Sequence, residues 1–179
     1  MVTDVMRAVL GLLRDSLPPL LQPGQIGFRS PADADETCLL GLFPYRLVKD
    51  IRYQLSDSLR VDGGKEAPPL CACVHLMVTS YAGKKSGLED DYKVLERVMQ
   101  LWSDVCEVPF TGAMQPSVVP PPRLELLSHD EDTVSKIWQF SGTPYRLSLF
   151  YQCAPIALPS LRFKSVPRIG EARYEAAGV

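Results

Sequence analysis

The residue types best suited to metal chemistry lie in one apolar segment, where Cys71, Cys73 and His75 alternate. On a β-strand these three side chains would share one face. Each two-residue step along a strand covers about 6.6–6.8 Å, so Cys71 and His75 would stand about 13 Å apart. Zinc requires ligand atoms about 2.0–2.3 Å away, which one regular strand cannot supply three times. The spacing therefore favours buried, reduced thiols on a central strand over a metal site.

A second segment, Ser128-His129-Asp130, contains the residue types of a hydrolytic triad. A triad needs its nucleophile, base and orienting acid to converge from separate places, which three adjacent residues cannot do. Ser128 and Glu131 instead have the spacing of a capping box, so we expect these residues to begin a helix.

Gly83-Lys84-Lys85-Ser86 resembles the end of a phosphate-binding loop. The full pattern requires Gly at the position of Val78 and Ser or Thr directly after Lys84, and both requirements fail. We expect a solvated turn here. The acidic runs 89–91 and 130–132 each fall in the first turn of an expected helix, where the helix dipole favours carboxylates. The sequence thus predicts no catalytic residue, no cofactor-binding residue and no metal ligand.

Composition limits the remaining classes of function. The chain has 179 residues, 46% hydrophobic and 22% charged, which fits one globular domain with a real core. A net charge of −2 gives no global electrostatic case for nucleic-acid binding. No apolar run reaches the roughly 18 residues needed to cross a bilayer, so we expect no membrane partner. Five cysteines are an odd number, and no signal peptide is evident, so we expect a protein with reduced thiols that is made and folds in the cytosol.

The first half of the chain predicts one helix and three strands. Apolar residues at helical spacing favour a helix over Thr3–Leu17, with Thr3 or Asp4 as its cap. Gln25–Ser30 and Thr37–Val48 indicate strands, the second with a bulge, edge or break at Pro44. The polar residues 57–69 predict a loop. Leu70–Tyr81 is apolar on both parities, which is typical of a central strand covered on both faces.

The second half alternates helices and strands. Ser86 and Glu89 predict a capping box for a helix whose packed stripe we expect to contain Tyr92, Leu95, Met99, Trp102 and Cys106. A short strand at Arg123–Leu127, a helix to about Phe140 and a last strand at Tyr145–Ala157 follow.

The resulting order, α-β-β-β-α-β-α-β, predicts a single α/β (α+β) domain built on a mixed β-sheet flanked by helices. We place this domain at residues 1–158 and a C-terminal extension at 159–179, because the composition turns polar and mixed in charge after Leu158.

Three parts of the chain together resemble one family: TDVMRAVLGLLRDSL, then LCACVHLMVTSYA with EDDYKVLERVMQLW, and above all LSHDEDTVSKIWQFSGTPYRLSLFYQC. They resemble the cap, or tail-terminator, proteins of phage-tail-like contractile injection systems of the antifeeding-prophage and virulence-cassette type. The similarity covers roughly Thr3–Ser165.

The resemblance implies a phage tail-terminator-like fold and a structural role without substrate or cofactor. Such a cap is a homo-hexameric ring that closes the end of the inner tube and sheath, sets their length and anchors the sheath end. The implied partners are the inner tube protein and the sheath protein, with no nucleic acid and no membrane. The protein would be cytoplasmic during assembly and part of a particle that can be released extracellularly.

For this role we expect the C-terminal extension to contact a neighbouring subunit or the sheath, by adding a strand to a sheet edge. The candidate interface residues are Leu161, Arg162, Phe163, Lys164, Arg168, Arg173 and Tyr174. Two alternatives remain: a small α/β ligand-binding enzyme with its site at the strand carboxyl ends, and an adaptor or chaperone that uses the Pro-rich loops and the extension.

Overall fold

The computed structural model describes residues 1–33, 37–53, 59–61, 64–83, 87–109, 119–139, 143–161 and 163–165. Its centre is a five-stranded sheet with the order β1-β2-β5-β7-β6. The strands are β1 (Ile26–Phe28), β2 (Leu40–Lys49), β5 (Leu70–Ser80), β6 (Arg123–Leu126) and β7 (Ser148–Leu158). β1 and β2 are parallel and every other neighbouring pair in this sheet is antiparallel, so the predicted mixed sheet is confirmed.

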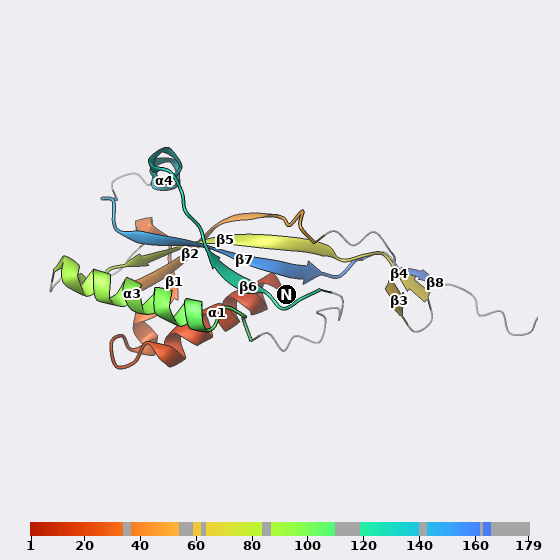
Figure 1. Ribbon diagram of the computed structural model, residues 1–179, viewed down its shortest axis with the longest axis horizontal. Helices are drawn as coiled ribbons and strands as arrows, with labels where there is room; N and C mark the ends of the chain where they lie inside the picture. Colours follow the sequence, from red (N-terminus) through yellow and green to blue (C-terminus); the bar gives the residue numbers. More distant parts are fainter. Residues whose placement is uncertain are drawn as a thin grey trace, which may run out of the picture.

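Helices cover the two faces of this sheet unequally. α1 (Val2–Ser16) and α3 (Leu88–Asp104) lie side by side against one face, while the short α4 (Glu131–Ile137) stands over one end of the other (Figure 1). Alternate residues of β5 serve the two sides, since Leu76 and Val78 join the large core under α1 and α3, whereas Met77 packs with Trp138 and Phe150 under α4. This arrangement confirms that Leu70–Ser80 is a central strand buried on both faces.

Of the bulge, edge position or break expected at Pro44, the structure has a bulge in β2. Pro44 pairs with Leu76 and Arg46 pairs with His75, so Tyr45 is the extra residue without an opposing partner. The bulge turns the Tyr45 side chain toward the α4 side of the sheet, where it packs with Phe150.

Several helix details differ from the sequence prediction. Leu95 and Trp102 are buried as expected, but Tyr92 is 57% and Met99 40% exposed, and Cys106 lies beyond the helix and is exposed. The buried face of α3 has the same period shifted by one position, through Asp91, Val94 and Val98.

Helix caps were also predicted wrongly. α1 begins after Met1 without a side-chain cap, because Asp4 pairs with the N-terminal ammonium group instead. α3 begins after Gly87, which has a φ of 110° and provides no side-chain cap, and Ser86 lies outside the described residues. α4 is capped by Asp130, whose carboxylate accepts from the Thr133 N–H, and not by Ser128.

A second, three-stranded sheet lies beyond the end of the main sheet at which β5 begins and β7 ends, and we call this small sheet the arm (Figure 1). It contains β3 (Leu59–Val61), β4 (Gly64–Glu66) and β8 (Phe163–Ser165), in the order β3-β4-β8. The loop predicted for residues 57–69 is therefore wrong in part, because β3 and β4 pair with each other. Two 3-10 turns, Pro23–Gln25 and Pro31–Asp33, flank β1.

Candidate functional site

The cysteine and histidine residues of β5 do not form a metal site. Cys71 is buried with Val119 and Ala157, the Cys73 thiol donates to Oε1 of Gln152 at 3.7 Å, and His75 faces Tyr45. Burial raises the pKa of the Cys73 thiol to about 11, so it stays protonated at neutral pH. Within the described part of the chain, no three His, Cys, Asp or Glu residues converge as metal ligands.

The acidic runs serve the fold. Asp91 is buried, accepts from the Gly83 N–H at 3.0 Å and lies 3.9 Å from the Arg146 guanidinium. Glu89 pairs with Lys93 on the exposed side of α3. Of the segment compared with a phosphate loop, residues 84–86 lie outside the described residues.

The two histidines of the chain meet at one hydroxyl group, which sequence reasoning missed. Oη of Tyr45 lies 3.0 Å from Nε2 of His129 and 3.5 Å from Nδ1 of His75. Burial, the Arg46 charge and His129 together lower the pKa of His75, which favours neutral imidazole. The bulge expected at Pro44 was the available sequence signal, since bulges re-aim a neighbouring side chain. The cluster joins β2, β5 and the segment before α4.

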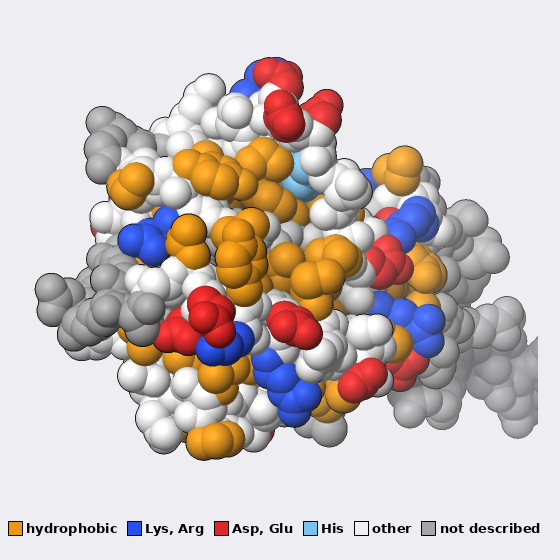
Figure 2. All heavy atoms as spheres, turned by 60° about the vertical axis from the view of Figure 1, so that its left-hand side comes forward, with side chains coloured by type: hydrophobic (Ala, Val, Ile, Leu, Met, Phe, Trp, Pro, Cys, Tyr) orange, Lys and Arg blue, Asp and Glu red, His pale blue; other side chains and the backbone are white. Residues whose placement is uncertain are grey.

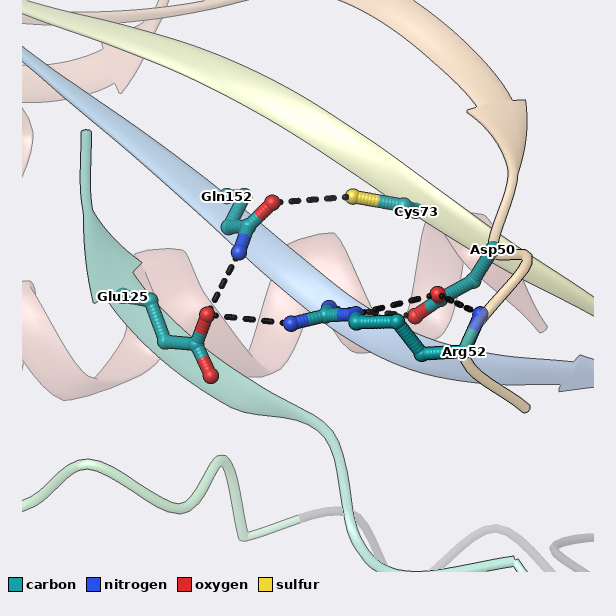
Figure 3. A network of polar contacts seen from close by, with 5 residues as sticks. All are labelled: Asp50, Arg52, Cys73, Glu125 and Gln152. Atoms are coloured by element: carbon teal, nitrogen blue, oxygen red, sulfur yellow. Dashed lines mark hydrogen bonds and ion pairs between the residues drawn. The ribbon is translucent and has the colours of Figure 1, made fainter. Parts of the chain in front are cut away.

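A polar network lies next to this cluster, since Gln152 of the network is the cross-strand partner of His75 (Figure 3). The Arg52 guanidinium donates to both oxygens of the buried Asp50 carboxylate at 3.1 Å and to Glu125 at 3.3 Å. Gln152 bridges this set, because its amide donates to Glu125 and its Oε1 accepts from Cys73. Hydrogen bonds to Asp50 raise the pKa of Arg52 further, so the network holds a fixed charge. The polar groups of this network bind one another, which favours a structural role for the network.

One face of the molecule, which we call the apolar face, exposes large hydrophobic side chains. Figure 2 shows hydrophobic side chains gathered below an acidic projection. A hollow of about 360 Å³ runs between α4, β6 and the start of β7, lined by Leu126, Val134, Tyr145 and Leu149 among others. We define the apolar face by the hydrophobic residues around this hollow, of which Leu126 is 50% and Tyr145 is 62% exposed. Such a surface is typical of a protein that binds other proteins.

Comparison with known protein families decides which group this fold belongs to. The family model for the Pvc16 N-terminal domain matches residues 4–171. The chain belongs to the Pvc16 N-terminal domain family. A comparison with curated protein sequences gives no match.

Two solved structures share the fold of this Pvc16 N-terminal domain. One is the sheath/tube terminator of the extracellular contractile injection system PVC in its extended state, with a TM-score of 0.67 and 18% identity. The other is the tube-terminating cap of the anti-feeding prophage, with a TM-score of 0.68 and 16% identity. They cover 100% and 98% of this chain, which spans 65% and 62% of their lengths. The predicted tail-terminator-like fold is thus confirmed.

The candidate interface residues of this Pvc16 N-terminal domain lie at the end of the arm. Leu161 is fully exposed, at 100%. Phe163 and Lys164 belong to β8, which pairs with β4 of the same chain. Arg162, Arg168, Arg173 and Tyr174 lie outside the described residues. In the described part of the chain, no helix combines the length and apolar character needed to cross a bilayer.

Proposed function

We propose that this protein is a structural cap, the tube and sheath terminator of a contractile injection system. The observation that carries the proposal is the Pvc16 N-terminal domain match over residues 4–171, supported by the same fold in two terminator and cap structures. Its partners would be the inner tube protein and the sheath protein of the same particle. It would assemble in the cytoplasm and leave the cell only as part of that particle.

Within this proposal the cap is a homo-hexameric ring that stops growth at a fixed length and anchors the sheath end. A closed ring needs two different complementary surfaces on each subunit. The apolar face, with Leu126 and Tyr145 exposed, supports this idea because a lone subunit would leave these side chains in water. We assign it to the contact between neighbouring subunits.

The arm is proposed to reach a neighbour or the sheath. β3 and β8 are the outer strands of the small sheet, so each has an edge at which another chain can add a strand. The exposed Leu161 stands just before β8. Residues 159–179 would therefore form the extension that links the cap to the rest of the particle, as a part distinct from the domain at 1–158.

A non-enzymatic role fits the geometry of the described residues. The thiols of β5 are buried, Asp130 caps α4, Asp50, Arg52 and Glu125 are paired with one another, and the two histidines contact the Tyr45 hydroxyl. The enzyme alternative would be supported by a bound small molecule in a pocket, and the adaptor alternative by binding to a single protein partner.

Electron microscopy of the purified protein, alone and mixed with the tube protein, tests the proposal. We expect six-fold rings alone or on tube ends. Leu126→Asp on the apolar face should prevent rings while leaving the melting temperature nearly unchanged, and Leu20→Asp, at a residue that is 44% exposed outside this face, serves as the matched control. A protein that stays monomeric and is absent from purified particles would contradict the proposal. Normal capped particles after deletion of residues 159–179 would contradict the role of the extension alone.

A further inference from the structure

The outer edge of β2 is open over its second half. β1 pairs only with Leu40–Leu42, and the Arg29 N–H adds one further bond to the Leu42 carbonyl at 3.1 Å. The chain then leaves the sheet through the turn at Pro31–Asp33. From Tyr45 to Lys49, no described residue pairs with the side of β2 that faces away from β5.

The ladder to β5 fixes which backbone groups this edge offers. The Asp50 N–H donates to the Cys71 carbonyl at 2.8 Å, toward β5. Because backbone groups of successive residues point to opposite sides of a strand, Leu47 and Lys49 direct both N–H and C=O outward. The edge of β1 is different, since the Ile26 carbonyl is occupied by two bonds from the Arg14 guanidinium.

An apolar hollow lies directly beside this open edge. It has a volume of about 390 Å³ and is formed where β1 ends and the start of α1 continues beneath the sheet. Its apolar lining includes Val2, Met6, Phe28, Leu47 and Val74. A strand added next to β2 would continue the line of β1 and place alternate side chains into the hollow.

The charges at the edge select what can bind. Arg46 and Lys49 are exposed, and neither has an ion-pair partner in the described part of the chain. Two copies of this edge paired with each other would bring like charges together, which is unfavourable across strands. Glu107 and Glu125, the acidic residues next to the main sheet's other edge strand, are already paired with Arg123 and Arg52. We therefore assign the acid to another protein.

We propose that the β2 edge, Tyr45–Lys49, binds an extended segment of a second protein, in which acidic residues alternate with apolar ones. Main-chain hydrogen bonds to Leu47 and Lys49 give the affinity. Apolar side chains of the segment enter the hollow, and its acidic side chains lie on the other face of the strand, the face of Arg46, whose cross-strand partner is His75. The inference does not depend on the cap function, because it uses only the strand, the hollow and the charges.

Two short peptides with blocked ends, one alternating glutamate with valine and one alternating lysine with valine, are the probes. Binding to the full-length protein is measured by fluorescence anisotropy, and hydrogen exchange reports protection of the Leu47 and Lys49 amides. We expect the acidic peptide to bind about tenfold more tightly than the basic one and to protect both amides.

Leu47→Pro is the central variant. It removes an outward N–H without removing a bond to β5, and proline is tolerated on an edge strand in that position. Affinity for the acidic peptide should fall about tenfold with no change in the β5 ladder amides. Should this variant fold poorly, the double variant Arg46→Glu with Lys49→Glu tests the same edge, since it should prefer the basic peptide.

Three results would overturn the proposal. The first is equal binding of both peptides, or of neither, to the unchanged protein. The second is acidic-peptide binding that survives Leu47→Pro, or a preference that the double charge reversal leaves unchanged. The third is protection of the Leu47 and Lys49 amides that rises with protein concentration and no peptide present, because a second copy of this chain would then occupy the edge.

Discussion

The Tyr45 hydroxyl lies 3.0 Å from Nε2 of His129, although 84 positions separate the two residues in the chain. This contact joins the bulge of β2 to the segment that begins α4. The His129 ring also packs edge-on against Phe150 of β7, with ring centroids 5.1 Å apart. One polar contact and one aromatic contact therefore hold α4 over the sheet, next to the hollow of the apolar face.

Stability should depend on pH through His75. Its pKa is lowered from the usual 6.5 by burial first, and then by Arg46 and His129. The unfolded chain therefore binds a proton more readily than the folded one, so the stabilising contribution is complete above pH 6.5 and is lost as the pH falls below that value. Thermal denaturation between about pH 7.5 and 5.5 should show a decreasing melting temperature.

The matched variant for this effect is His75→Asn, which keeps a polar side chain but does not titrate in this range. Its melting temperature should change less over the same interval than that of the unchanged protein. Parallel curves for the two proteins would show that His75 is not the group responsible.

Replacing Arg52 by Ala should destabilise the fold. Asp50 is only 4% exposed and would lose the two hydrogen bonds of 3.1 Å that neutralise it. We expect a loss of about 2 kcal/mol in the free energy of unfolding, below the 3–5 kcal/mol of a fully buried pair because Arg52 is half exposed. Urea denaturation measures it.

A double-mutant cycle with Asp50→Asn isolates this ion pair. Arg52→Ala should cost clearly less in the Asp50→Asn background, where no buried negative charge remains. The same cost in both backgrounds would mean that the Arg52 side chain acts through packing, not through its charge.

The strands of the main sheet could be predicted because their signals are local. Leu70–Ser80 is apolar on both parities, which indicated a buried strand, and Pro44 cannot donate to a ladder, which indicated a bulge, an edge position or a break. β3 and β4 could not be predicted, because three-residue strands of polar composition depend on pairing with each other and with β8. The shifted face of α3 shows the same limit, since helical period fixes the spacing of buried residues but not which of two adjacent rows, Tyr92 and Met99 or Asp91 and Val98, turns inward.

The candidate site was less predictable than the fold. The expectation that Cys71, Cys73 and His75 do not bind a metal was based on strand geometry alone. The meeting of His129 with Tyr45 required the tertiary arrangement, because 84 positions separate the two residues. Asp50 and Arg52 are close in the sequence, but no motif indicates that the Asp50 carboxylate is buried. The open edge of β2 could not be predicted either, because it depends on the residue at which β1 stops pairing with β2.

The sequence predicted Ser128 as the cap of α4, whereas the structure has Asp130 in this role. Asp130→Ala should lower the melting temperature and speed hydrogen exchange in α4, because the Thr133 N–H loses its acceptor at 2.8 Å. The same hydrogen bond lowers the pKa of the Asp130 carboxyl group, so acidification should weaken the cap as this carboxylate is protonated. Ser128→Ala is the control and should have little effect. The reverse order of effects would restore Ser128 as the cap.

The same substitution, Gly to Ala, should have opposite effects at two positions. At Gly83 a new Cβ would lie 2.5 Å from Oδ2 and 3.0 Å from Cγ of Asp91, a buried side chain that is held by the Gly83 N–H. Asp91 would have to move, so we expect Gly83→Ala to cost about 1–3 kcal/mol in the free energy of unfolding. At Gly11, inside α1, nothing lies within 4 Å of the added Cβ, and Ala is the better helix former, so Gly11→Ala should stabilise by about 0.5–1 kcal/mol. Urea denaturation of both variants measures the pair of effects. A stable Gly83→Ala protein would mean that the Asp91 carboxylate has room to rotate away, which its contact with Arg146 argues against.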